Sequence, residues 1–285
     1  MFRTIRRAIV ALALCCGLFA AISCTAANPQ QPVAADAPRL AGADNFRDIA
    51  GTGAGYVAQG SHRVRKGAVY RSNALTFGDA DLAAVQGLGI ADVIDMRNAS
   101  EIAKAPDRVP PGASYVSIPI LAGDVSQIPG GIISPEQAAE LLRTANRMFV
   151  TDAAAREGLA QSLTRIAEQP GPVVIHCTAG KDRTGWTAYL LQSLVGVDAD
   201  TSMNDYLLTN EYSAASIEAT IAHISATRGP QAAAVYRPFL VVDRTYLEAG
   251  IAQLNSDYGT VDKYLRDGLG LRPEVVDALR AKLLR

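Results

Sequence analysis

The sequence of 285 residues predicts an α/β fold, and three observations support this prediction. Short apolar runs of strand length alternate with longer segments of helical periodicity. One such run, Pro172 to Ile175, is rich in β-branched residues and is followed by a glycine-containing loop and then a helical pattern. About 245 residues follow a proline-rich N-terminal segment, which is enough for one large domain with a substantial core.

The elements follow in order along the chain. Before the loop, strands are expected at 92–96 and 115–118, and helices at 79–86, 135–149 and 153–168. After it, helices are expected at 184–195, 201–212, 213–227, 244–254, 261–268 and 273–284. This is more helix than a catalytic core needs. One pair could therefore cover the site as a lid or simply pack against the core.

The loop runs His176-Cys177-Thr178-Ala179-Gly180-Lys181-Asp182-Arg183-Thr184-Gly185. It places a cysteine and an arginine at the two ends of a small turn between a strand and a helix. Backbone N–H groups of the loop and of the first helical turn can converge on one point, where the helix dipole adds partial positive charge. The spacing therefore predicts an oxyanion site.

The residue types at this site indicate phosphoryl chemistry. The field that attracts an oxyanion also favours the thiolate form of Cys177, which makes it a nucleophile. Arg183 can bind two phosphoryl oxygens in a bidentate fork. The Thr184 hydroxyl can donate to the sulfur, His176 is expected to orient the loop, and Asp182 is a candidate general acid.

At these residues the chain resembles the cysteine-dependent phosphatases, whose signature is His-Cys, five residues, and Arg-Ser/Thr. More narrowly, 179–185 is similar to the secreted bacterial tyrosine phosphatase B group, which has tyrosine, serine/threonine and phosphoinositide phosphatase activities. The resemblance extends over about residues 40 to 285. The other matching segments are 45–51, 69–72, 93–97 with Glu101, 205–210 and 264–270.

This resemblance implies a protein tyrosine phosphatase-like domain with a central, mostly parallel sheet flanked by helices and a helical lid. It also implies two-step hydrolysis through phosphocysteine, without a metal or other cofactor. In this group the general acid is thought to lie within the loop, which points to Asp182. Asp95, at the end of an apparent strand, is the second acidic candidate.

The remaining site residues are expected to bind substrate or to support the loop. Lys181 either attracts a second phosphate or is a solvated loop charge, and a basic stretch could line the same entrance or form a solvated face. Arg97 is expected to pair with Glu101 by spacing, and Asp48 with basic neighbours in space. The substrate-binding set is Thr178, Ala179, Gly180, Lys181 and Asp95; the supporting set is His176, Asn45, Arg47, Asp48 and Arg97; the basic stretch is Arg47, Arg63, Arg65, Lys66 and Arg71.

The N-terminus indicates export. Residues 1–24 have the basic-then-apolar order of a secretory signal, 25–38 form a flexible linker, and 39–285 form the phosphatase domain. Cys24 is a candidate lipidated first residue that would tether the protein to a membrane in the cell envelope. Cleavage after Ala26 or Ala27, giving a secreted or periplasmic protein, is the alternative. Cys177 is then the only thiol of the folded part, so no intrachain disulfide is expected.

Composition narrows the range of partners. The formal net charge of −1 and the 6% aromatic content argue against nucleic acid, and leave a phosphorylated protein or a phosphoinositide as the expected substrate. Two other functions compete with phosphatase activity. A sulfurtransferase also uses a loop cysteine, and a noncatalytic phospholigand-binding module needs the loop but no nucleophile.

Overall fold

The computed structural model describes residues 34–120 and 134–285, and these form one compact unit. The expected signal peptide, Cys24 and both cleavage positions lie outside the described residues. Among the helices of the described part, none is long and apolar enough to cross a membrane.

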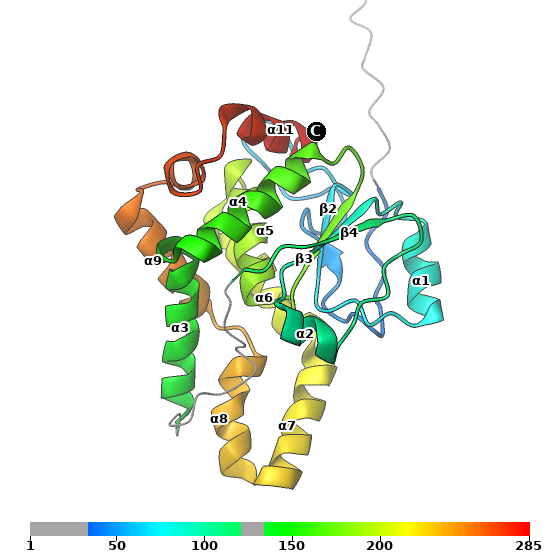
Figure 1. Ribbon diagram of the computed structural model, residues 1–285, viewed down its shortest axis with the longest axis vertical. Helices are drawn as coiled ribbons and strands as arrows, with labels where there is room; N and C mark the ends of the chain where they lie inside the picture. The colour runs from blue at the N-terminus through cyan, green and yellow to red at the C-terminus, as the bar shows by residue number, and fades with distance from the viewer. Residues whose placement is uncertain (1–33, 121–133) are drawn as a thin grey trace, which may run out of the picture. The chain divides into compact units, whose positions relative to one another are not determined.

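A five-stranded sheet lies at the centre of the domain, in the order β1-β2-β5-β3-β4 (Figure 1). The strands are β1 (Arg47–Asp48), β2 (Val69–Ser72), β3 (Asp92–Asp95), β4 (Ser114–Ser117) and β5 (Val173–His176). All neighbouring pairs are parallel except β1 with β2. The predicted α/β class and the mostly parallel sheet are therefore confirmed.

Helices surround this sheet. Those before the loop are α1 (Asp79–Gln86), α2 (Ala99–Lys104), α3 (Pro135–Thr151) and α4 (Ala153–Glu168). Those after it are α5 (Asp182–Leu194), α6 (Ala199–Tyr212), α7 (Ala214–Arg228), α8 (Pro230–Leu240), α9 (Arg244–Asp257), α10 (Val261–Lys263) with the π-helical turn η1 (Tyr264–Gly268), and α11 (Pro273–Leu283).

Successive side chains of the central strands point to opposite faces, and each face has its own core. Ile94 and Ile175 pack in a large cluster with Leu159 of α4. Val93 and Val174 belong to a smaller cluster that includes Val85 of α1. Figure 1 shows α1 on one side of the sheet and α4 and α5 on the other. Burial on both faces explains why the middle strands are continuously apolar apart from their ends.

The predicted helices at 79–86 and 153–168 have the bounds that the structure shows, and the other predicted helices overlap observed ones. Helices α2 and α8 are not among the expected helices. Helix α8 begins with Pro230, which suits a helix start, but Pro238 lies inside it, where proline usually breaks a helix. Gly229, with φ of +89°, turns the chain between α7 and α8, a conformation that favours glycine. The expected helical lid stays a prediction, and it is not assigned to a particular pair of helices.

The end of the expected linker is bound to the domain. Asp36 forms an ion pair with Lys66, whose side chain is 2% exposed, and accepts a hydrogen bond of 2.9 Å from the Gly53 amide. The last residues of the expected linker therefore include a contact with the domain, and the flexible tether over 25–38 stays a prediction. The rest of the expected linker lies outside the described residues.

Candidate active site

The predicted loop connects β5 to α5. The strand ends at His176 and the helix begins at Asp182. Gly180 lies between them with φ of +67°, and a Cβ at this position would lie 2.4 Å from the backbone oxygen of Ser72. Glycine is needed here because a larger residue would be strained and would also collide with β2.

The carbonyl groups of the loop are held from outside. Thr178 O accepts from the Ala74 amide at 3.1 Å. Asn45 Nδ2 donates to the oxygens of Ala179 and Gly180 at 3.0 and 3.1 Å. Because these oxygens are turned toward neighbouring segments, the opposed N–H groups of the loop are available to an anion.

Cys177 lies at the start of the loop and is 3% exposed. The Thr184 hydroxyl, in the first turn of α5, donates to Cys177 Sγ at 3.2 Å. This is the contact that the sequence predicts. A hydroxyl at this distance stabilises negative charge on the sulfur.

Arg183 is fixed by Glu101, the residue that the sequence pairs with Arg97 instead. Its Nη1 and Nη2 donate to Glu101 Oε2 and Oε1 at 2.9 and 2.5 Å, and Thr178 Oγ1 also donates to Oε1 at 2.5 Å. Burial lowers the pKa of Arg183, but the charges of Cys177 and Glu101 outweigh it and the net pKa is raised. Burial alone would raise the pKa of Glu101. The hydrogen bonds and positive charge of Arg183 outweigh burial, so the pKa of Glu101 is lowered and the carboxylate remains ionised.

The local sequence around Glu101 indicates one role for this residue, which is to cap the start of α2. It is the third residue of α2, and with Asn98 it forms a reciprocal capping box in which each side chain accepts from the other's amide at 3.0 Å. The capping pattern predicts a helix start. It does not predict that the same carboxylate also binds an arginine from α5.

Asp182 and Lys181 form an ion pair at the first turn of α5, with 2.9 Å between Nζ and Oδ2. The Asp182 side chain is 16% exposed, and its Oδ1 has no hydrogen-bond partner. Lys181 is 4% exposed and its Nζ lies 5.8 Å from the centre of the Tyr246 ring. It is therefore not the solvated loop charge that the sequence left open.

Asp95 lies in a different environment. Arg97 donates to both of its oxygens at 2.9 and 2.8 Å, Tyr115 Oη donates to it at 2.8 Å, and its side chain is fully buried. These contacts argue against direct contact between Asp95 and substrate. The expected pair of Arg97 with Glu101 is wrong, because Arg97 pairs with Asp95 and Asp107.

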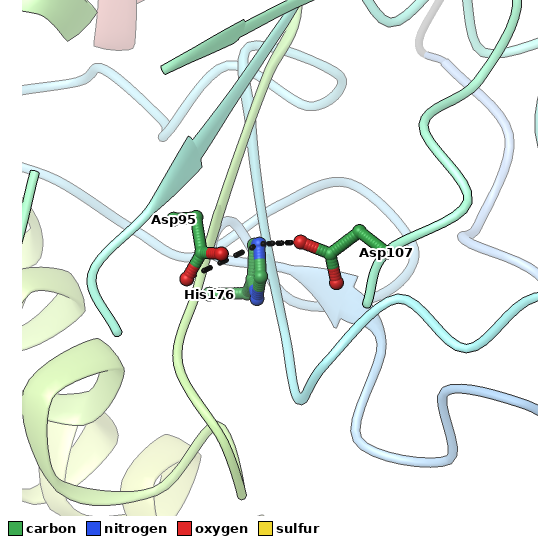
Figure 2. A group of neighbouring side chains, drawn as sticks. All are labelled: Asp95, Asp107 and His176. Atoms are coloured by element: carbon green, nitrogen blue, oxygen red, sulfur yellow. Dashed lines mark ion pairs between the residues drawn. The ribbon is translucent and has the colours of Figure 1, made fainter. Parts of the chain in front are cut away.

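Figure 2 shows His176 between these two carboxylates. Its Nε2 lies 3.2 Å from Asp107 Oδ2 and 3.8 Å from Asp95 Oδ1. The three side chains have the spacing of a metal site. Arg97 already occupies both carboxylates with its positive charge, so the cluster fits an internal ion-pair network better than a cation. His176 Nδ1 faces the Cys177 oxygen at 3.4 Å, as expected of a residue that orients the loop.

The other supporting residues lie behind the loop. Arg47 Nη2 donates to Asp205 O at 2.9 Å, and its Nη1 also binds the Asn45 side chain. Asp48 accepts from the amides of Ala50 and Gly67 at 2.9 and 2.6 Å, in place of the ion pair expected from the sequence. Burial raises the pKa of Asp48 to about 6.

The expected basic entrance does not form. Arg47 and Arg71 are buried and paired with Asp205, and Lys66 is paired with Asp36. Arg63 donates to the Gly55 oxygen, and Arg65 to the oxygens of Lys282 and Leu284. These side chains hold segments of the domain together instead of lining one surface.

A cysteine that accepts from a threonine hydroxyl and an arginine fixed by a carboxylate, at the two ends of one loop, are the arrangement expected of a cysteine-dependent phosphatase. The chain belongs to the tyrosine phosphatase family, whose model matches residues 38–285. It is therefore a protein-tyrosine phosphatase.

Known relatives agree with this assignment. The chain is 31% identical to a putative tyrosine-protein phosphatase of Cupriavidus necator, over 87% of this chain and 91% of the relative. It is also 31% identical to the triple specificity protein phosphatase PtpB of Mycobacterium tuberculosis, over 86% and 98%. A tyrosine-protein phosphatase of Nostoc commune is 28% identical over 96% of both chains.

Proposed function

We propose that the enzyme hydrolyses phosphate monoesters in two steps through a phosphocysteine intermediate. Cys177 Sγ attacks phosphorus and the bond to the leaving oxygen breaks, while Asp182 gives that oxygen its proton. Arg183 and the loop amides bind the equatorial oxygens throughout. Water then attacks phosphorus, Asp182 takes its proton, and the thiolate leaves.

The observation that carries this proposal is the position of Cys177 Sγ. It lies at the start of a loop whose carbonyls are held outward, with Thr184 donating to it at 3.2 Å and Arg183 at the other end of the loop. Thr184 can therefore stabilise the sulfur when it leaves in the second step. Asp182 is the better acid candidate, because Asp95 is fully buried against Arg97.

The direct test is phosphate release from a phosphotyrosine peptide by the purified protein, with EDTA present and Cys177→Ser as control. Activity that is lost in this variant, together with a trapped phosphoenzyme in acid-quenched wild type, supports the thiol mechanism. Activity that persists in Cys177→Ser refutes it.

We further propose that the substrate range extends to phosphoserine, phosphothreonine and phosphoinositides. Two observations support this: the relative from Mycobacterium tuberculosis is named a triple specificity phosphatase, and Lys181 adds a buried cation beside Asp182. A second phosphate on the substrate would compete with Asp182 for Lys181. Lys181→Gln should then weaken hydrolysis of a polyphosphorylated phosphoinositide more than that of a phosphotyrosine peptide. Equal loss on both substrates contradicts this role.

The proposed place of action is outside the cytoplasm, as an envelope lipoprotein or as a secreted or periplasmic enzyme. The support is the basic and apolar order of residues 1–24 and the position of Cys24 at their end. Intact mass measurement of the protein recovered from cells distinguishes the alternatives. An acylated N-terminal Cys24 supports a membrane tether, and a free N-terminus after Ala26 or Ala27 supports ordinary cleavage.

A further inference from the structure

Asp205, on the inner side of α6, is a buried carboxylate that the proposed chemistry does not use. It is 1% exposed and lies between two arginines that are themselves buried. Its Oδ2 accepts from Arg71 Nη1 at 2.9 Å, and its Oδ1 lies 3.6 Å from Arg47 Nε. The Tyr56 hydroxyl donates to Oδ1 at 3.2 Å. A carboxylate with this many charged and polar partners is held in one orientation.

Both arginine side chains connect Asp205 to the loop between β5 and α5, Arg71 directly and Arg47 through Asn45. Arg71 Nη2 donates to the Gly180 oxygen at 2.9 Å. Arg47 binds the side-chain oxygen of Asn45, and Asn45 Nδ2 donates to the oxygens of Ala179 and Gly180. Two routes therefore lead from one carboxylate to the Gly180 oxygen, one directly through Arg71 and one through Arg47 and Asn45, and the second also reaches the Ala179 oxygen.

We propose that Asp205 is a positioning residue for phosphate binding: by holding Arg71 and Arg47 it keeps the carbonyls of Ala179 and Gly180 turned outward and the loop amides directed at the phosphoryl group. This inference rests on the proposed function of the loop. Asp205 itself touches neither substrate nor Cys177 in this arrangement, and acts only through the arginines.

The electrostatics explain why a carboxylate is needed. Arg47 and Arg71 are 3% and 1% exposed, and two like charges at such depth repel each other. Burial, followed by the charge of Arg71, lowers the pKa of Arg47 to about 10, while the charge of Asp205 opposes both effects. Without Asp205 the two guanidinium groups would move apart or toward solvent, because removing one partner of a buried pair leaves an uncompensated charge. Either movement releases the loop oxygens.

The test measures binding of inorganic phosphate to the full-length protein by calorimetry in the Cys177→Ser background, which separates anion binding from turnover. Asp205→Asn keeps the shape and removes the charge, and we expect phosphate to bind about 10- to 100-fold more weakly. In the wild-type background the KM for a phosphotyrosine peptide should rise by a similar factor. Unchanged phosphate affinity in a folded Asp205→Asn protein overturns the inference. A Cys177→Ser protein that binds no phosphate at all removes the proposed loop function, and the inference with it.

Asp92→Asn is the matched control. Asp92 is also fully buried and accepts two hydrogen bonds from one arginine, Arg165, at 2.7 and 3.0 Å. It lies at the start of β3, opposite Val173, so it is at the end of the sheet away from the loop. We expect this variant to lose stability but to keep phosphate affinity within about twofold. An equal loss of affinity in Asp92→Asn and Asp205→Asn would show general destabilisation and would overturn the inference.

Two further variants keep the inference falsifiable if Asp205→Asn does not fold. Tyr56→Phe keeps the carboxylate and removes one hydrogen bond to it, and should weaken phosphate binding about two- to fivefold. Asp205→Ala opens space beside a cavity of about 50 Å³ lined by Arg47, Tyr56, Asp205 and Tyr212. Formate, but not chloride, should enter it and restore phosphate affinity. Unchanged affinity in Tyr56→Phe, or no effect of formate on a folded Asp205→Ala, contradicts the proposed role.

Discussion

Glu101→Gln is the substitution that best tests whether the orientation of the Arg183 guanidinium depends on the carboxylate of Glu101, which is not part of the loop. Glu101 accepts two hydrogen bonds from Arg183 and one from Thr178, and it is 3% exposed. Glutamine keeps the shape but replaces one acceptor oxygen with an amide that faces the guanidinium. The loss of one charge-assisted hydrogen bond is worth about 1.5–3 kcal/mol. If this loss appears in the transition state, kcat/KM falls about 10- to 150-fold.

The assay is hydrolysis of a phosphotyrosine peptide, with urea unfolding measured on the same samples. Asn98→Ala is the control, because it removes the other half of the capping box and leaves the contact of Glu101 with Arg183 in place. It should cost about 1 kcal/mol of stability and change kcat/KM less than twofold. A folded Glu101→Gln enzyme within threefold of wild type would refute the reasoning, as would an equal loss of activity in Asn98→Ala.

Three further predictions concern the acid, the loop backbone and pH. Asp182→Asn should lower kcat on a phosphotyrosine peptide by about 10²- to 10⁴-fold while phosphate still binds, and unchanged turnover with a poor leaving group would reject the acid role. Gly180→Ala should abolish phosphate binding in calorimetry, because its Cβ would meet Ser72 O at 2.4 Å; retained affinity would show that β2 can yield. Asp48 has its pKa raised from 3.8 to about 6 by burial, so the native state binds the proton more tightly than the unfolded state does. Its contribution to stability is therefore greatest below pH 4 and falls by ~3 kcal/mol in total as pH rises through 6 to about 7, and in urea unfolding Asp48→Asn should lack this part of the slope; an identical slope in both proteins would contradict the shift.

The parts of the fold that sequence analysis predicted are those set by local pattern. Helix α4 has the predicted bounds, because Asp152 caps its start and its apolar spacing is regular. The loop was predicted for the same reason, since the strand, the glycine and the helix are contiguous. Helix α8 was missed because tertiary packing overrides the effect of Pro238 on local propensity.

The charged contacts of the site could not be predicted in this way. Arg97 and Glu101 are four residues apart, a spacing that favours a pair on a helix. Arg97 precedes α2, however, and its guanidinium turns back to Asp95 while Glu101 faces Arg183. The choice between the two pairings depends on where β3 and α5 lie relative to each other. That position is a property of the sheet order, which one sequence does not encode locally.

The loop is thus surrounded by three arginine–carboxylate groups that come from distant parts of the chain. Glu101 holds Arg183, Asp205 holds Arg71, and Asp107 lies beside both Arg97 and His176. Arg183 belongs to the loop, Arg71 donates to the Gly180 oxygen of the loop, and His176 ends the strand before it. The sequence signature contains the residues proposed to bind the phosphoryl group. The three carboxylates lie outside that signature and fix the orientation of the groups in the loop. A chain with the signature but without the three carboxylates would therefore keep the nucleophile and lose the geometry, which is why substitutions at Glu101 and Asp205 test the site as directly as substitution of Cys177.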